Sequence, residues 1–103
     1  MFGDLMGKLQ DAQKQMEETK KRLDSVFVEA EAEGGLVKVK ANANRKIVNI
    51  SISQQLVDEK DKDALEDLVL TAVNRALEQA EKVNESEMQN VAMGMMPNIP
   101  GIF

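Results

Sequence analysis

The chain has 103 residues, with 18 acidic and 13 basic side chains and a formal net charge of −5. This length suits one domain. Cysteine, histidine, tyrosine and tryptophan are absent, which excludes disulfides, zinc–thiolate sites and cysteine nucleophiles and removes the commonest general base. Neither a signal peptide nor a run of roughly 20 apolar residues is present. The sequence therefore predicts a cytoplasmic protein that does not act at a membrane.

A heptad pattern over residues 2–26 predicts the first helix. Seven of its eight seam positions are apolar; the eight are Phe2, Leu5, Leu9, Ala12, Met16, Thr19, Leu23 and Val26. The charges that flank the seam are all basic, at Lys8, Lys20 and Arg22. We therefore expect this seam to pack on the sheet and on the acidic second helix, because a parallel copy would bring like charges together.

Strict alternation of apolar and polar residues predicts three strands, within residues 26–33, 37–41 and 48–52. Gly34-Gly35 predicts a two-residue turn between the first two strands, since glycine tolerates the positive φ of primed turns. The resulting register pairs Ala32 with Val37, Ala30 with Val39, Val28 with Ala41, Glu31 with Lys38 and Glu29 with Lys40. A two-residue turn at Gly34-Gly35 thus places the apolar pairs on one face of the sheet and the oppositely charged pairs on the other.

A second turn is expected at Asn44-Arg45. It would place Ala41 opposite Val48 and Val39 opposite Ile50 and complete an antiparallel meander. In that register Phe27, Asn42 and Ile47 line up on the outer face.

The remaining chain reads as a polar connection, a helix and a tail. The acidic residues within 56–63 lack the pattern of a calcium-binding loop. They are instead typical of the N-terminus of a helix, where carboxylates meet the positive end of the helix dipole. The spacing from Asp63 to Glu66 is that of a capping box. Residues 64 to about 90 form a wide apolar stripe typical of a helix, in which Ala72, Ala76 and Ala80 permit close approach of another backbone. Residues 91–103 form a tail rich in Met, Pro and Gly, which we expect to be partly docked or disordered.

The predicted fold is α+β, in the order helix, three-stranded antiparallel meander, long helix (α-β-β-β-α), with residues 1–90 as the single domain. The last strand is an edge without proline and with one charge, at Lys46. Such edges recruit a partner, and the apolar faces exceed what one chain can cover. We therefore expect a dimer.

Charge is unevenly distributed, with four basic and no acidic residues in 36–57 but ten acidic and four basic residues in 58–90. Phosphate contact requires accessible cations and no catalytic group. The candidate DNA-binding residues lie on the first helix and the hairpin: Lys8, Lys14, Lys20, Lys21, Arg22, Lys38, Lys40, Arg45 and Lys46. No catalytic residue, metal site, cofactor or small-molecule substrate is expected.

Several short motifs, in this order and spacing, resemble the YbaB/EbfC family of nucleoid-associated proteins over nearly the whole chain. They are Met1-Phe2-Gly3, Gly35-Leu36-Val37-Lys38-Val39, Leu65-Glu66-Asp67-Leu68-Val69, Ala72-Val73-Asn74-Arg75-Ala76 and Met93-Gly94-Met95, with Pro97 and Phe103. The resemblance implies a tweezer-shaped cytoplasmic homodimer, associated with the nucleoid, that binds duplex DNA with little sequence specificity and influences nucleoid organisation or gene expression. It also implies that the helical arms make the main DNA contacts, which points to the cations of the first helix.

The main alternative is a protein-interaction or assembly module that uses the acidic second helix and the Met-rich tail. A membrane-surface helix at residues 1–24 is disfavoured, since this segment has no net charge and its seam is needed by the core. An enzyme is disfavoured because no histidine is present to activate a serine and no phosphate-binding glycine loop exists.

Overall fold

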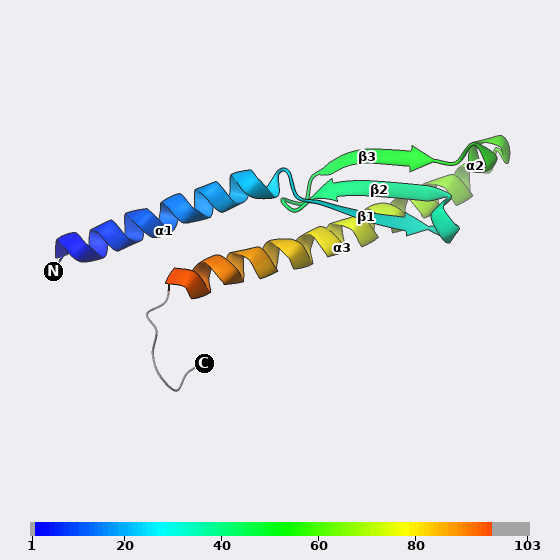
Figure 1. Ribbon diagram of the computed structural model, residues 1–103. Coiled ribbons are helices and arrows are strands. Elements are labelled where there is room, and N and C mark those ends of the chain that lie inside the picture. The colour runs from blue at the N-terminus through cyan, green and yellow to red at the C-terminus, as the bar shows by residue number, and fades with distance from the viewer. Residues whose placement is uncertain (1, 96–103) are drawn as a thin grey trace, which may run out of the picture.

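The computed structural model describes residues 2–95, which form one three-stranded sheet, two long helices and a short helix (Figure 1). The elements in chain order are α1 (Phe2–Leu23), β1 (Phe27–Ala32), a 3-10 turn (Glu33–Gly35), β2 (Val37–Asn42), β3 (Ile47–Ile52), α2 (Gln54–Asp58) and α3 (Lys62–Met95). The sheet is antiparallel with strand order β1-β2-β3. The predicted α+β order is confirmed, and α2 is an additional helix that overlaps the segment, residues 56–63, expected to be a plain connection.

The first hairpin has the predicted register. Val28 pairs with Ala41, Glu29 with Lys40, Ala30 with Val39, Glu31 with Lys38 and Ala32 with Val37. The turn needs glycine, because φ is +62° at Gly34 and +96° at Gly35, and the Leu36 amide closes it by donating to the Glu33 carbonyl at 3.3 Å. These positive φ angles are those of a primed hairpin turn, whose twist matches that of the strands.

The second hairpin corrects one predicted pair. Val39 pairs with Ile50 as expected, but Ala41 pairs with Ile47, and the register shifts between Lys40 and Ala41. The predicted pairing of Ala41 with Val48 is therefore wrong, because Val48 is the extra residue of a β-bulge. Ile47 is consequently half-buried against the core rather than aligned with Phe27 on the outer face.

The side chain of Asn42 explains this irregular turn. Its Oδ1 accepts hydrogen bonds from the Asn44 amide at 3.0 Å and the Lys46 amide at 3.1 Å. Asn42 also receives the Arg45 amide on its carbonyl at 3.0 Å and donates its own amide to Lys46 at 2.9 Å. The Asn side chain thus stabilises a three-residue loop, Ala43 to Arg45, which Asn42 and Lys46 close and which is one residue longer than the loop expected.

The core lies between α3 and two of the three strands. Ala72, Ala76 and Ala80 are fully buried, so the predicted close approach of α3 to another backbone is confirmed. On the same face of the sheet, however, Ile50 and Ile52 of β3 remain 44% and 37% exposed. The described residues therefore leave much of the apolar face of β3 exposed.

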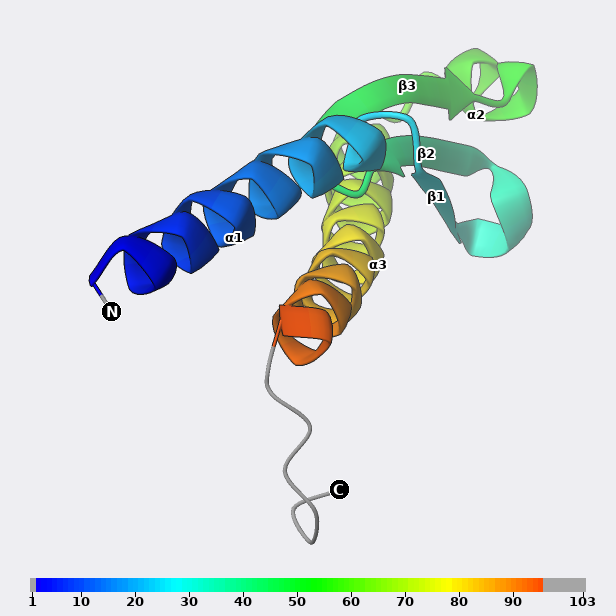
Figure 2. The same cartoon turned by 60° about the vertical axis from the view of Figure 1, so that its left-hand side comes forward.

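α1 runs outward from the sheet instead of lying on it (Figure 1). Thr19 and Leu23, at its C-terminal end, are buried, whereas Leu5 and Leu9 are more than half exposed. The predicted packing of the seam on the sheet and the second helix is therefore correct only for the last turns. The physical reason is visible in Figure 2, where α1 and the C-terminal end of α3 diverge, so the outer part of the seam meets neither surface.

The two helices after the sheet begin at side-chain caps. Ser53 Oγ accepts from the Gln55 amide at 3.2 Å before α2, and Asp61 Oδ1 accepts from the Ala64 amide at 3.1 Å before α3. Asp61 is thus the N-cap, so the capping box expected from Asp63 to Glu66 is wrong by two residues. α3 continues to Met95, past the expected end near residue 90, and residues 96–103 of the predicted tail lie outside the described residues.

Candidate nucleic-acid interface

Two helical arms extend from the same end of the sheet (Figures 1 and 2). We call them the α1 arm, which is the whole of α1, and the α3 arm, which is residues 81–95. At 1.5 Å per residue, the 22 residues of α1 span about 33 Å, close to one turn of duplex DNA. Between the arms lies an open cavity of about 300 Å³ lined by Gln15, Glu18, Thr19, Arg22 and Val91.

The β2–β3 turn contacts both arms at the ends that lie next to the sheet. The Ala43 amide donates to the Leu23 carbonyl at 3.2 Å, and Asn44 Nδ2 donates to the Lys20 carbonyl at 2.7 Å. From the other side, Asn84 Nδ2 donates to the Ala43 carbonyl at 3.0 Å. We call this contact of Ala43 and Asn44 with α1 and α3 the joint.

The cations of the α1 arm are exposed but do not share one face. They are Lys8, Lys14, Lys20, Lys21 and Arg22. At about 100° per residue, Lys14 and Lys21 lie on the face opposite the buried Thr19 and Leu23. Arg22 points toward the other arm, where its Nη2 lies 2.6 Å from Glu87 Oε2. One candidate cation therefore already holds a carboxylate.

The sheet cations lie on a separate surface, the outer face of β2. Lys38 is opposite Glu31 and Lys40 is opposite Glu29, and Lys40 Nζ lies 4.5 Å from the ring centroid of Phe27. The glutamates on the neighbouring strand offset the positive charge of this face. A duplex here would meet two cations and two anions.

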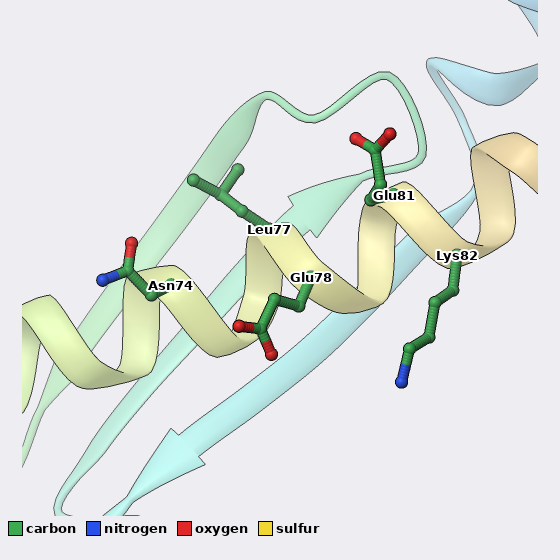
Figure 3. Close-up of a pocket in the computed structure, with 5 residues that line it drawn as sticks. All are labelled: Asn74, Leu77, Glu78, Glu81 and Lys82. Carbon is green, nitrogen blue, oxygen red and sulfur yellow. The ribbon is translucent and has the colours of Figure 1, made fainter.

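Arg45, in the β2–β3 turn, is held by α3. Its Nη1 donates to Glu81 Oε2 at 2.9 Å, and Figure 3 shows Glu81 directed toward the turn while Glu78 and Lys82 point away from it. This hydrogen bond, helped by charge attraction, raises the pKa of Arg45 and lowers the pKa of Glu81. Lys46, the next residue, is exposed.

The structure therefore divides the nine predicted cations between the α1 arm, the outer face of the sheet and the β2–β3 turn. Sequence reasoning missed the role of Glu81 and Glu87, the two carboxylates that hold Arg45 and Arg22. The only available signal was the excess of acids on the second helix, which gives the sign of the charge but not the pairing.

Other kinds of site are not indicated by the geometry of residues 2–95. Within this range, the carboxylate side chains form no group of three or more that could hold a metal ion. None of the described helices is long and apolar enough to cross a membrane. The candidate site that remains is the set of cations on the α1 arm, on the outer face of the sheet and in the β2–β3 turn.

The model of the YbaB/EbfC DNA-binding family matches residues 1–96. The chain belongs to this family. A nucleoid-associated protein of Flavobacterium johnsoniae is 44% identical over 98 residues, which cover 95% of this chain and 91% of that protein. Another, of Thermoanaerobacter pseudethanolicus, is 45% identical over 98 residues, covering 92% of this chain and 86% of that one. The resemblance predicted from the short motifs is thus confirmed.

The fold is similar to that of a solved structure. An uncharacterized protein of Helicobacter pylori superposes with a TM-score of 0.71 at 24% sequence identity, covering 94% of this chain and 98% of that one. This likeness shows that the fold of nearly the whole chain also occurs in a solved structure.

Proposed function

We propose that this protein binds duplex DNA as a homodimer, with little sequence specificity, and so influences nucleoid organisation or gene expression from the cytoplasm. The observation that carries the proposal is the family match over residues 1–96, together with the names of the relatives as nucleoid-associated proteins. The α1 arm is the favoured contact surface, because it is about as long as one duplex turn and carries five basic residues. Their long side chains can extend to a duplex while the shorter acids of the same helix, such as Glu17 and Glu18, stay behind.

Low sequence specificity follows from the side chains available. The α1 arm offers lysines, which meet phosphates as point charges and carry no base information. The chain has no tyrosine or tryptophan, and single-stranded nucleic acids are usually held by stacking on aromatic rings. A duplex contacted through its phosphates is therefore the best match.

The homodimer is supported by an uncovered apolar surface, the β3–α3 surface, formed by Val48, Ile50, Ile52, Leu70 and Leu77. Val48, Ile50 and Leu70 are 45%, 44% and 60% exposed, and Leu77 points from α3 toward β3 in Figure 3. Next to it, Leu77 lines an open groove of about 530 Å³ with Asn74, Glu78, Glu81 and Lys82. A second copy placed here would also cover the edge of β3.

The dimer surface is tested by Ile50→Asp, which puts a charge in the middle of the β3–α3 surface. We expect light scattering to give twice 11.4 kDa for the parent and a monomer for the variant. Asn49→Asp adds the same charge on the opposite face of β3 and should remain a dimer. A monomeric parent at micromolar concentration would contradict the proposal.

The affinity should be weak, because the α3 arm and β1 carry carboxylates that repel phosphate. We expect a dissociation constant in the non-specific range of about 10⁻⁴–10⁻⁶ M at physiological salt. Gel shifts with two unrelated duplexes across a salt series test this, with similar affinities and a steep salt dependence as the expected result.

A second candidate function, protein interaction, is favoured by a pocket at the other end of the molecule. It has a volume of about 450 Å³, and leucines from three segments meet carboxylates at its rim; the lining residues are Glu33, Leu36, Leu56, Glu59, Ala64, Asp67 and Leu68. If the parent binds no duplex even at low salt, this candidate replaces DNA binding.

A further inference from the structure

Two carboxylates of α3 occupy arginines that belong to the candidate DNA surface. Glu87 lies 2.6 Å from Arg22 of the α1 arm, and Glu81 lies 2.9 Å from Arg45 of the β2–β3 turn. These are two of the three ion pairs within 4 Å in the described residues, and the third, Lys62 with Glu66, lies within one helix. Both pairs that connect different elements therefore engage candidate DNA-binding arginines.

The Arg22–Glu87 pair is accessible to a competing anion. The side chains of Arg22 and Glu87 are 53% and 31% exposed, so a phosphate can approach the guanidinium without unfolding the chain. Carboxylate and phosphate oxygens recognise the same donors of arginine in the same geometry. An exposed ion pair is also weak, so exchange of one anion for the other is feasible.

We propose that Glu87 and Glu81 are intramolecular competitors of DNA phosphate, each holding one arginine until a duplex displaces it. This proposal rests on the proposed function and concerns its regulation. Because Arg22 and Glu87 lie on different arms, exchange at Arg22 also removes the ion pair that joins the α1 arm to the α3 arm. DNA binding is thereby coupled to separation of the arms.

Affinity measured across a salt series tests this competition. Each phosphate contact contributes about 0.9 to the slope of log affinity against log salt. Because Arg22 reaches a phosphate in the parent complex as well, once Glu87 is displaced, Glu87→Gln should leave this slope unchanged. The variant should instead bind more tightly at every salt concentration, by up to about fivefold, because no ion pair has to be broken. Glu81→Gln should act in the same way through Arg45.

Glu78→Gln is the matched control. It removes the same charge from α3, but Glu78 is in none of the three ion pairs and points away from the β2–β3 turn (Figure 3). We expect this variant to bind slightly more tightly, through long-range charge, with the parent slope. Compared with Arg22→Ala alone, the double variant Arg22→Ala/Glu87→Gln should gain no more affinity than Glu78→Gln does, because the freed arginine is absent.

The outcomes separate the inference from the function on which it rests. If the parent binds DNA and Glu87→Gln gains no more affinity than Glu78→Gln, the competition is overturned while DNA binding stands. If Arg22→Ala/Glu87→Gln gains as much affinity over Arg22→Ala as Glu87→Gln gains over the parent, Arg22 is not the cation released, and the inference is overturned again. If the parent binds no duplex at low salt, the proposed function and the inference fall together. Circular dichroism of each variant verifies that the helices are intact.

Discussion

Removing Lys20 and Lys21 should weaken DNA binding by an amount that the structure helps to define. Neither lysine is in an ion pair within 4 Å in the described residues, unlike their neighbour Arg22. Both are therefore available to phosphates, and at about 0.9 per contact Lys20→Ala/Lys21→Ala should flatten the salt slope by up to about 1.8 for each α1 arm that contacts the duplex. Adding Arg22→Ala should change the slope further only to the extent that Arg22 leaves Glu87.

The matched control is Lys60→Ala/Lys62→Ala, which removes the same charge at the other end of the molecule, beside α2 (Figure 1). Gel shifts from about 50 to 200 mM salt compare the two double variants with the parent. The control should lower affinity slightly and keep the parent slope. Equal slopes for both double variants, with helix content intact, would refute the assignment of DNA contacts to the α1 arm.

Three further predictions concern stability. Gly34→Val places a β-branched residue at φ +62°, so thermal unfolding should show a loss of about 1–3 kcal/mol; an unchanged midpoint would contradict the turn geometry. Asp61→Ala removes the cap on the Ala64 amide and should cost about 1 kcal/mol in urea unfolding, whereas Asp61→Asn should restore most of it. The hydrogen bond from Arg45 lowers the pKa of the Glu81 carboxyl below its ordinary value of 4.5. This bond therefore stabilises the folded chain above pH 4.5, and the stabilisation is lost as the pH falls through the lowered pKa. In Glu81→Gln, the unfolding free energy measured against pH should fall less steeply in this acid range.

The strand pairing of the first hairpin could be predicted because several constraints coincided. Alternation fixes which residues share a face, and Gly34-Gly35 fixes where the chain reverses, so a one-residue error would have exchanged the apolar and charged faces. The second hairpin lacked such a constraint. Its bulge depends on the Asn42 side chain bonding two amides of the turn, a contact that composition and periodicity do not reveal.

The candidate site was predictable as a set of residue types but not as an arrangement. Exposed lysines on an amphipathic helix can be identified from the heptad, since they fall outside the apolar seam. Whether a cation is free or paired depends on long-range contacts, such as the one between Arg22 and Glu87, which are 65 positions apart. The exposed seam of α1 was unforeseen for the same reason, because periodicity shows that a face is apolar without showing what covers it.

The joint makes the α1 arm a lever. The arm is about 33 Å long and is held at one end, so a rotation of about 10° at the joint displaces the far end by about 6 Å. Asn44 bonds both the carbonyl of Lys20 at 2.7 Å and the carboxylate of Asp24 at 2.6 Å, which sets the angle at which the helix leaves the sheet. A change at Asn44 would therefore move the outermost lysines without changing the number of cations on the arm, so two proteins with the same surface charge would hold those cations at different positions.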